Sequence, residues 1–250
     1  MLHGRSSYRQ CRETDTTKRR PPDCGAPVSE PQTMDAQLAT RRKDLGHGAW
    51  VVYEPHFLQP SRAEDVLERL LDELTWEQRE NVVFGKRIAQ PRLCAWAGAL
   101  PYRFSGQTLE PRAPSPTLDA LTAEVVAAVG HPFNHVVVNR YRDGKDWIAR
   151  HSDNERELGY RPLIAALSLG VTRRFVLTRK RGRRAEKMRL EHGSLLIMGG
   201  SCQHTWRHAL PRDPGVTGER LNLTWRLLHG PPGWTRNPAD DPNRRSPHES

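Results

Sequence analysis

Two segments in the first half of the chain repeat apolar residues at the spacing of an amphipathic helix. In the first, Ser61 precedes Glu64 by three residues, the pattern of a capping box, and apolar residues then recur on one helical face: Val66, Leu67, Leu70, Leu71 and Leu74. The second begins at Ser115 and Pro116, a cap residue and a first-turn proline, and runs to Gly130 through Leu118, Leu121, Val125 and Val129. The chain is therefore predicted to form two helices before residue 135.

The pattern changes from about residue 135 onward. Short apolar or alternating runs follow one another, separated by glycine, proline and charged residues: HVVVNRY, LIAALSLG, RRFVLTR, GSLLIMGG and ERLNLTWRLL. Several strands at such short spacing indicate a sandwich or a barrel. The fold class is predicted to be mainly β with flanking helices.

The two ends of the chain lack this patterning. Residues 1–45 are rich in Arg, Pro, Thr and Asp without apolar periodicity, and residues 231–250 repeat that composition. Such segments bury too little apolar surface to offset the entropy of ordering. We therefore expect a disordered basic tail at residues 1–45, a disordered tail at residues 231–250, and one folded domain at residues 46–230.

Composition restricts the class of protein and its compartment. The chain has 250 residues, enough for one domain with tails, and no apolar run approaches the roughly 18 residues of a transmembrane helix. The four cysteines form no CxxC pair, and the N-terminus has no apolar stretch that could act as a secretion signal. We expect an intracellular monomer that contacts no membrane, in the cytoplasm if the protein is bacterial and in the nucleus if it is eukaryotic.

Positive charge is in excess and is partly concentrated. A formal net charge of +10 favours polyanion partners through phosphate neutralisation, although many basic proteins are simply solvated. The stretch RRFVLTRKRGRRAEKMR places six cations in one predicted hairpin loop: Arg179, Lys180, Arg181, Arg183, Arg184 and Lys187. This loop is predicted to hold phosphates, with a solvated loop as the alternative.

Candidate metal ligands occur at two places in the β-rich half. His151 and Asp153 are two residues apart, so on an extended chain their side chains project to the same side, although by itself the pair also suits a surface loop. A distant histidine would close the face, and His208 is preferred over His204 for this role. Two histidines and one carboxylate leave three positions open on iron for a co-substrate and O₂. A zinc hydrolase with the same ligands is an alternative.

The last predicted strand supplies a candidate anion site. Arg220, Asn222, Thr224 and Arg226 alternate with apolar residues, so two guanidinium groups share one face. Inside a barrel they need anions, and a dicarboxylate such as 2-oxoglutarate provides them, since a guanidinium binds a carboxylate through paired hydrogen bonds. A solvent-facing strand with exposed arginines is the alternative. Asn139 and Tyr141 form a second same-face pair just before the metal motif.

Taken in order, these motifs resemble the AlkB family of nucleic-acid dealkylating dioxygenases. The resemblance rests on NRYRDGKDWIARHSDNERELG, LIAALSLGVTRRFVL, HGSLLIMGGSCQHTWRHALP and ERLNLTWR, and upstream on FGKRIAQPRLCAWAGALPYRFSGQTLEP, which is similar to the animal AlkB homologues that repair alkylated DNA. It covers about residues 80–228. It implies a double-stranded β-helix (jelly-roll) core at residues 135–230 and an N-terminal extension at residues 46–134 with a nucleotide-recognition lid.

The resemblance also implies roles for individual residues. His151, Asp153 and His208 match the family's iron ligands. The 2-oxoglutarate contacts are matched by Asn139, Tyr141, Arg220 and Arg226, with Asn222 as a weaker candidate. Arg220 is expected to pair with the distal carboxylate and Arg226 to lie nearer the keto-acid end. The cofactors implied are Fe(II), with 2-oxoglutarate and O₂ as co-substrates, and the products are succinate, CO₂ and formaldehyde.

The substrates implied are bases in DNA methylated at Watson–Crick nitrogens, such as 1-methyladenine and 3-methylcytosine. Such bases are cationic and pair poorly, which lowers the cost of flipping them out and lets aromatic rings hold them. Tyr102 and Phe104 match the lid positions, with His151 as the opposite wall. Glu155 matches an acidic position that faces the base, and Arg92 is assigned to the same group of contacts. Strand packing is the alternative for the aromatic residues, and a charged surface turn for Glu155.

Preference for duplex or single strands depends on two further features. Phe84, in the run VVFGK, resembles the wedge that duplex-repairing members insert into the base stack, with core packing as the alternative. After His208, where duplex-acting relatives carry a basic cluster, this chain has only Arg212 in the run PRDP. Three functions therefore remain in view: a DNA demethylase, an RNA demethylase of the same family, and a nucleic-acid-binding protein without turnover.

Overall fold

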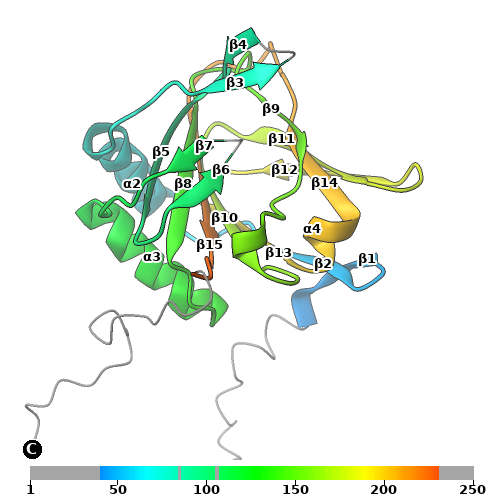
Figure 1. The fold of residues 1–250 in the computed structure, drawn as a ribbon. Helices are drawn as coiled ribbons and strands as arrows, with labels where there is room; N and C mark the ends of the chain where they lie inside the picture. Colours follow the sequence, from blue (N-terminus) through cyan, green and yellow to red (C-terminus); the bar gives the residue numbers. More distant parts are fainter. Residues whose placement is uncertain (1–39, 84–85, 105–106, 231–250) are drawn as a thin grey trace, which may run out of the picture. The chain divides into compact units, whose positions relative to one another are not determined.

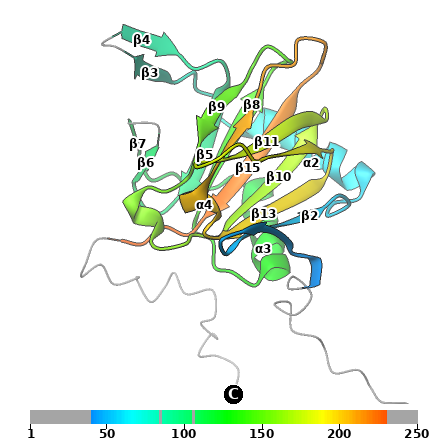
Figure 2. The same ribbon diagram turned by 90° about the vertical axis from the view of Figure 1, so that its right-hand side faces the viewer.

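Two antiparallel sheets face each other and form the body of the protein (Figures 1 and 2). The computed structural model describes residues 40–83, 86–104 and 107–230. The larger sheet has seven strands in the order β1 (Lys43–Gly46), β2 (Ala49–Glu54), β13 (Ser194–Gly200), β10 (Ile164–Gly170), β15 (Arg220–Arg226), β8 (His135–Tyr141) and β5 (Leu93–Gly98).

The smaller sheet completes the jelly roll. Its four strands run in the order β12 (Ala185–Leu190), β11 (Arg173–Arg179), β14 (Trp206–Leu210) and β9 (Ile148–His151). An apolar cluster fills the space between the two sheets and includes Ile164, Phe175, Leu177, Met198 and Trp206. The mainly β, double-stranded β-helix fold predicted from the sequence is confirmed.

Register brings the chemistry-bearing residues of distant strands together. In β15 and β8, Arg220 lies opposite Tyr141 and Asn222 opposite Asn139. In β14 and β9, His208 lies opposite His151. Because paired residues of an antiparallel sheet point to the same face, each pairing places two predicted site residues side by side.

Two helices cover the outer side of the larger sheet (Figures 1 and 2). They are α2 (Pro60–Glu73) and α3 (Pro116–Val129), and their buried faces join strand residues in the largest apolar cluster. The predicted start of α3 is confirmed, since the Ser115 side chain accepts from the Leu118 amide and Gly130 ends the helix in the left-handed conformation. The predicted capping box at Ser61 is wrong. Helix α2 begins at Pro60, which fits the first turn, so its N-cap is Gln59, two residues before Ser61, and this residue forms no side-chain cap bond.

Two hairpins lie outside both main sheets. They are β3 (Glu80–Val83) with β4 (Lys86–Ala89), and β6 (Tyr102–Phe104) with β7 (Gln107–Leu109). An apolar cluster that includes Trp96, Tyr102 and Leu109 packs β6 and β7 against the edge of the larger sheet. These hairpins occupy the part of the chain in which the lid is predicted.

The predicted domain boundaries need two corrections. Strand β1 begins at Lys43, inside the predicted tail, and turns back on β2 through Gly46, His47 and Gly48, all with positive φ. The core does not start at residue 135, since β2 pairs with β13 and β5 pairs with β8. Their short apolar runs complete the sheet on either side of the strands that the later sequence supplies. Residues 1–39 and 231–250 lie outside the described structure.

None of the helices in the described ranges combines the length and the apolar composition that crossing a membrane requires.

Candidate metal centre and its cavity

Three predicted metal ligands converge at one point between the sheets. His151 ends β9, Asp153 follows two residues later, and His208 lies in β14. Their ligand atoms all lie within 4.8 Å of one another, and His151 Nε2 is 3.7 Å from Asp153 Oδ1. Two imidazoles and a carboxylate gathered in this way are the donor set of non-haem Fe(II) oxygenases.

The Asp153 carboxylate is anchored on one side only. Its Oδ2 accepts hydrogen bonds from Arg226 Nε (3.2 Å) and Nη2 (2.8 Å), and its backbone amide donates to Gln203 Oε1 (3.0 Å). Burial raises the pKa of the Asp153 carboxyl, but Arg226 and the two histidines lower it to about 2. The other oxygen, Oδ1, is buried and has no hydrogen-bond partner among the residues that the structure describes. Since an orphaned buried carboxylate oxygen is costly, this atom fits a bound cation.

The two imidazoles are suited to ligate a metal. Burial lowers the pKa of His208 to about 3, so its ring is neutral, which is the form that binds metals. Phe175 stacks on it at a centroid distance of 5.7 Å and fixes its plane. His151 Nδ1 lies 2.9 Å from the Ala149 carbonyl, so a proton on Nδ1 leaves the Nε2 lone pair directed at the cluster.

His204, the alternative third ligand, does not belong to the cluster. It lies in the short helix α4 (Cys202–Thr205) and is exposed. Its Nε2 accepts from the Arg161 amide at 3.2 Å, and its ring stacks on Tyr160. The preference for His208 agrees with the geometry because β14 begins after α4 and pairs His208 with His151.

A buried guanidinium that pairs with no carboxylate of the described ranges lies next to this cavity. Arg220 is completely buried, and its donors reach only neutral groups: Ser168 Oγ (2.8 Å), the Leu221 carbonyl (3.2 Å) and Asn222 Oδ1 (3.4 Å). Its Nε has no partner within the described residues, and burial lowers its pKa to about 10. A buried charge without a counter-ion is unfavourable, so this position fits an anionic ligand.

The other predicted cofactor contacts line the cavity of the triad. Asn139, Tyr141, Asn222, Thr224 and Arg226 all contribute to its wall. The Tyr141 ring lies 5.8 Å from the Arg220 guanidinium, which connects the triad end of the cavity to the anion end. Arg226, expected near the keto-acid end, also orients the carboxylate of Asp153, the candidate metal ligand.

Arg92 lies deeper than a substrate contact at the surface. It is 4% exposed, and its Nε donates to Asn139 Oδ1 at 2.6 Å. The structure therefore places Arg92 against a predicted cofactor contact.

The substrate side is only partly described. Tyr102 is fully buried, its hydroxyl donates to Glu155 Oε2 at 3.1 Å, and its ring packs edge-on against His135. Burial raises the pKa of Glu155. Phe104 ends β6, but its side chain lies outside the described part, as does Phe84 entirely. Tyr102 thus contacts the predicted base-facing acid through its hydroxyl.

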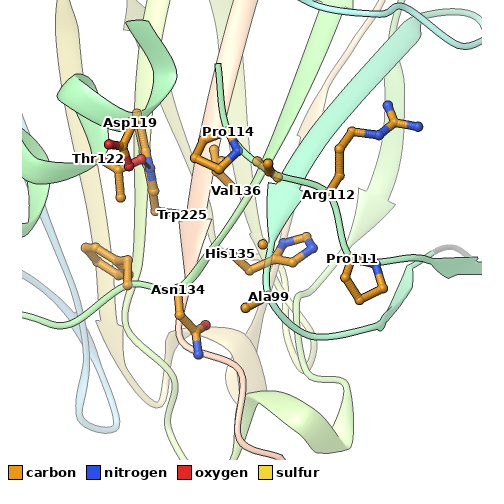
Figure 3. Close-up of a pocket in the computed structure, with 14 residues that line it drawn as sticks. Ala99, Pro111, Arg112, Pro114, Asp119, Thr122, Asn134, His135, Val136 and Trp225 are labelled. Atoms are coloured by element: carbon orange, nitrogen blue, oxygen red, sulfur yellow. Dashed lines mark hydrogen bonds between the residues drawn. The ribbon is translucent and has the colours of Figure 1, made fainter. Parts of the chain in front are cut away.

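A separate cavity of about 420 Å³ lies on the helix side of the larger sheet (Figure 3). Val136 of β8 and Trp225 of β15 line it from the sheet, and Pro111 and Pro114 line it from the segment before α3. It contains none of the triad residues, so it is distinct from the metal centre.

Three supporting residues escaped the sequence analysis. Gln203 holds the Asp153 amide, Ser168 accepts from Arg220, and Arg173 donates to the carbonyls of Asp143, Asp146 and Pro211. Gln203 and Ser168 lie within quoted motifs, but a lone polar residue there gives no signal of its partner.

A Gln203→Met variant is expected to bind Fe(II) about tenfold more weakly, because loss of a group that orients a metal ligand typically costs 10- to 100-fold in affinity. Methionine keeps the volume of the buried side chain but removes the acceptor for the Asp153 amide. Anaerobic Fe(II) titration with a melting curve of the apoprotein checks this. An unchanged affinity would mean that Arg226 alone holds Asp153.

Comparison with known proteins defines the family. Residues 50–226 match the 2OG-Fe(II) oxygenase superfamily. Alpha-ketoglutarate-dependent dioxygenase alkB homolog 3 of Rattus norvegicus is 38% identical over an alignment of 188 residues, which covers 71% of this chain and 64% of the relative. The DNA oxidative demethylase ALKBH2 of Bos taurus is 41% identical over an alignment of 172 residues, which covers 65% of this chain and 62% of the relative. The chain thus spans a little under two thirds of the length of these two relatives.

Solved structures agree in fold. "The structure of OsALKBH1" aligns with a TM-score of 0.55 at 19% identity, over 74% of this chain and all of the other. A 2OG-Fe(II) oxygenase family oxidoreductase from Burkholderia pseudomallei aligns with a TM-score of 0.51 at 16% identity, over 79% of this chain and 91% of the other.

The chain belongs to the 2OG-Fe(II) oxygenase superfamily. Its similarity to animal AlkB homologues, predicted from the ordered motifs, is confirmed. The predicted enzyme class is confirmed with it, and so are the cofactors that name the class, Fe(II) and 2-oxoglutarate. The triad and Arg220 fit these two groups by their donor set and charge.

Proposed function

We propose that this protein is an oxidative demethylase of DNA that acts on bases methylated at Watson–Crick nitrogens, such as 1-methyladenine and 3-methylcytosine. Its similarity to a relative described as a DNA oxidative demethylase supports the substrate class. The net charge of +10 supports a polyanionic substrate.

One structural observation carries the proposal. A single cavity has the His151, Asp153 and His208 triad at one end and, at the other, the Tyr141 and Asn222 side chains that contact the buried Arg220. A metal hydrolase needs the triad but has no use for an uncompensated guanidinium. A dicarboxylate co-substrate needs both, since one end would reach the metal and the other would pair with Arg220.

The triad would hold Fe(II), and Arg220, Tyr141 and Asn139 would hold 2-oxoglutarate. When bound, iron and 2-oxoglutarate together with O₂ supply oxidation of the N-methyl group, which leaves as formaldehyde while 2-oxoglutarate becomes succinate and CO₂. Arg226 and Gln203 keep the Asp153 carboxylate in place on the protein side of the centre. These residues therefore fix the reacting position before substrate arrives.

Glu155 and Tyr102 would select the base. The Glu155 carboxylate lies two residues beyond Asp153 and receives the Tyr102 hydroxyl, which fixes its direction. A fixed carboxylate acceptor near the reacting position favours a cationic ring that carries an exocyclic amine. Methylated adenine and cytosine have both features. Tyr102 acts here as a positioning residue.

Turnover of methylated oligonucleotides tests the proposal. The protein is loaded anaerobically with Fe(II) and then given 2-oxoglutarate, O₂ and single-stranded DNA that carries 1-methyladenine or 3-methylcytosine. Formaldehyde and succinate are expected in equal amounts, and the unmethylated oligonucleotide is the control. Faster turnover of matched RNA would favour the RNA demethylase alternative. No formaldehyde from any methylated DNA or RNA would refute a demethylase.

A further inference from the structure

The outer face of the four-stranded sheet is strongly basic. Leu177 of β11 lies opposite Glu186 of β12 on one side and opposite His208 of β14 on the other, so these three side chains share the inner face of the sheet. The residues that alternate with them point outward. Every charged residue at an outward position, or in β9 where the register is irregular, is cationic and exposed. These residues are Arg150 in β9, Arg174 in β11, Lys187 and Arg189 in β12, and Arg207 in β14.

These five cations are not paired with any other described residue. Within the described part of the chain, none of them makes a hydrogen bond or an ion pair, and no acidic residue occupies an outward position of β11, β12 or β14. Exposed arginines on α2 differ, since Arg62 pairs with Glu124 and Arg69 pairs with Asp65. The cations of the basic face therefore differ from these surface arginines, whose charge is balanced by a neighbouring carboxylate.

The fold gains nothing from this arrangement. Arg174 lies directly opposite Arg189, and like charges opposite each other destabilise an antiparallel pair. A carboxylate at either position would stabilise the sheet. Two guanidinium groups placed opposite each other without a counter-ion fit a ligand that neutralises both.

The cations of the basic hairpin predicted from the sequence have two different roles. Lys180 donates to the Gln203 carbonyl, and Arg184 donates to the Leu45 carbonyl and to Glu186. These cations hold the hairpin to the body of the protein. Arg181 and Arg183 are exposed at its tip. The basic surface thus continues from the tip along the sheet through Lys187 and Arg189.

The basic face adjoins the metal centre. In β14, Arg207 points outward and the next residue, His208, points inward to the candidate triad. In β9, exposed Arg150 precedes His151, and β9 is the edge strand of its sheet. The two long helices pack on the other sheet, so they leave this face open (Figures 1 and 2). A chain that passes the metal centre at His151 can therefore cross the edge at Arg150 onto the basic face.

We propose that this face binds the phosphate backbone of the nucleic-acid strand next to the base held at the metal centre. The proposal rests on the proposed function and adds a second contact region to it. Four of the five cations are arginines, which bind phosphate through paired hydrogen bonds. The face has no exposed large apolar side chain that would enter a membrane. Its cations span all four strands, which suits an extended polyanion.

Binding of an unmethylated oligothymidine of about 20 nucleotides tests this face without requiring catalysis. The double variant Arg174→Gln/Arg189→Gln is expected to bind about tenfold more weakly at roughly 0.1 M salt. The slope of log K against log salt should shrink in magnitude by about 1.4, because each phosphate contact on a single strand contributes about 0.7. The matched control Arg62→Gln/Arg69→Gln removes the same charge from α2 and should bind like the unchanged protein.

Turnover separates this inference from the proposed function. On a methylated trinucleotide, which is too short to extend from the metal centre past β14 to Arg174 and Arg189, the double variant should match the unchanged protein. On a methylated strand of about 20 nucleotides, its KM should rise about tenfold. If both variants bind the oligothymidine equally, or if polyglutamate displaces it as well as DNA does, the face is not a nucleic-acid site. If the protein binds the oligothymidine through this face but turns over no methylated substrate, only the proposed demethylase activity is refuted.

Discussion

An Asp153→Asn variant is expected to lose Fe(II) binding and turnover while keeping its fold. The amide retains an oxygen for the Arg226 hydrogen bonds, but it removes the negative charge that the free Oδ1 offers to the metal. Because loss of a group that merely orients a ligand costs 10- to 100-fold, loss of the ligand charge should lower Fe(II) affinity and kcat/KM by more than about 100-fold. Anaerobic metal titration, formaldehyde release and a melting curve measure these quantities.

The matched control is Asp146→Asn. Asp146 is also buried and ion-paired, with Arg142, but it lies outside the triad. It should retain iron and turnover. Asp153→Ala is a poorer test, because it leaves the buried Arg226 without its carboxylate, a change that typically costs about 3–5 kcal/mol of stability. Appreciable activity of folded Asp153→Asn would overturn the iron assignment.

The central strands of the larger sheet follow directly from the sequence. Their apolar residues form continuous or regularly alternating runs that are easily recognised in the sequence, because both faces of these strands are largely buried. The strands are β8, β10, β13 and β15. The run HVVVNRY, for example, coincides with β8. Likewise, α3 carries cap residues at both ends, and its bounds were predicted.

The strands of the smaller sheet are harder to predict. Strand β9 has four residues, and β12 reads AEKMRL, with charged residues at half of its positions. Both lie at sheet edges with an outer face open to solvent, so they bury little apolar surface. Their existence depends on pairing with β14 and β11, which local patterning does not encode.

Some residues of the candidate site could likewise be predicted from the sequence, and others could not. Alternation along β15 places Arg220 and Asn222 on one face, so the sequence predicts the anion end of the cavity. The choice between His208 and His204 depends on where α4 ends and β14 begins, a boundary that only the paired strand fixes. Gln203 and Ser168 could not be predicted, since their partners lie far away in the sequence.

An Arg220→Met variant is expected to raise the KM for 2-oxoglutarate by about 100-fold or more. Two charge-assisted hydrogen bonds to a carboxylate would be lost, each worth about 1.5–3 kcal/mol, and about 1.4 kcal/mol corresponds to tenfold in affinity. The apoprotein should melt close to the unchanged protein, because removal of a buried charge without a carboxylate partner among the described residues offsets the loss of its hydrogen bonds to Ser168, Leu221 and Asn222. Steady-state kinetics and melting curves with and without 2-oxoglutarate measure both effects.

Arg173→Met is the matched control, because Arg173 is equally buried and also lacks a carboxylate partner in the described ranges. Its donors reach the carbonyls of Asp143, Asp146 and Pro211, so its loss leaves buried acceptors unpaired and should lower the melting temperature. The two variants thus have opposite signatures: Arg220 would be retained for a ligand and Arg173 for the fold. If Arg220→Met melts well below the unchanged protein and its KM for 2-oxoglutarate is unaltered, Arg220 is a structural residue and the co-substrate carboxylate binds elsewhere.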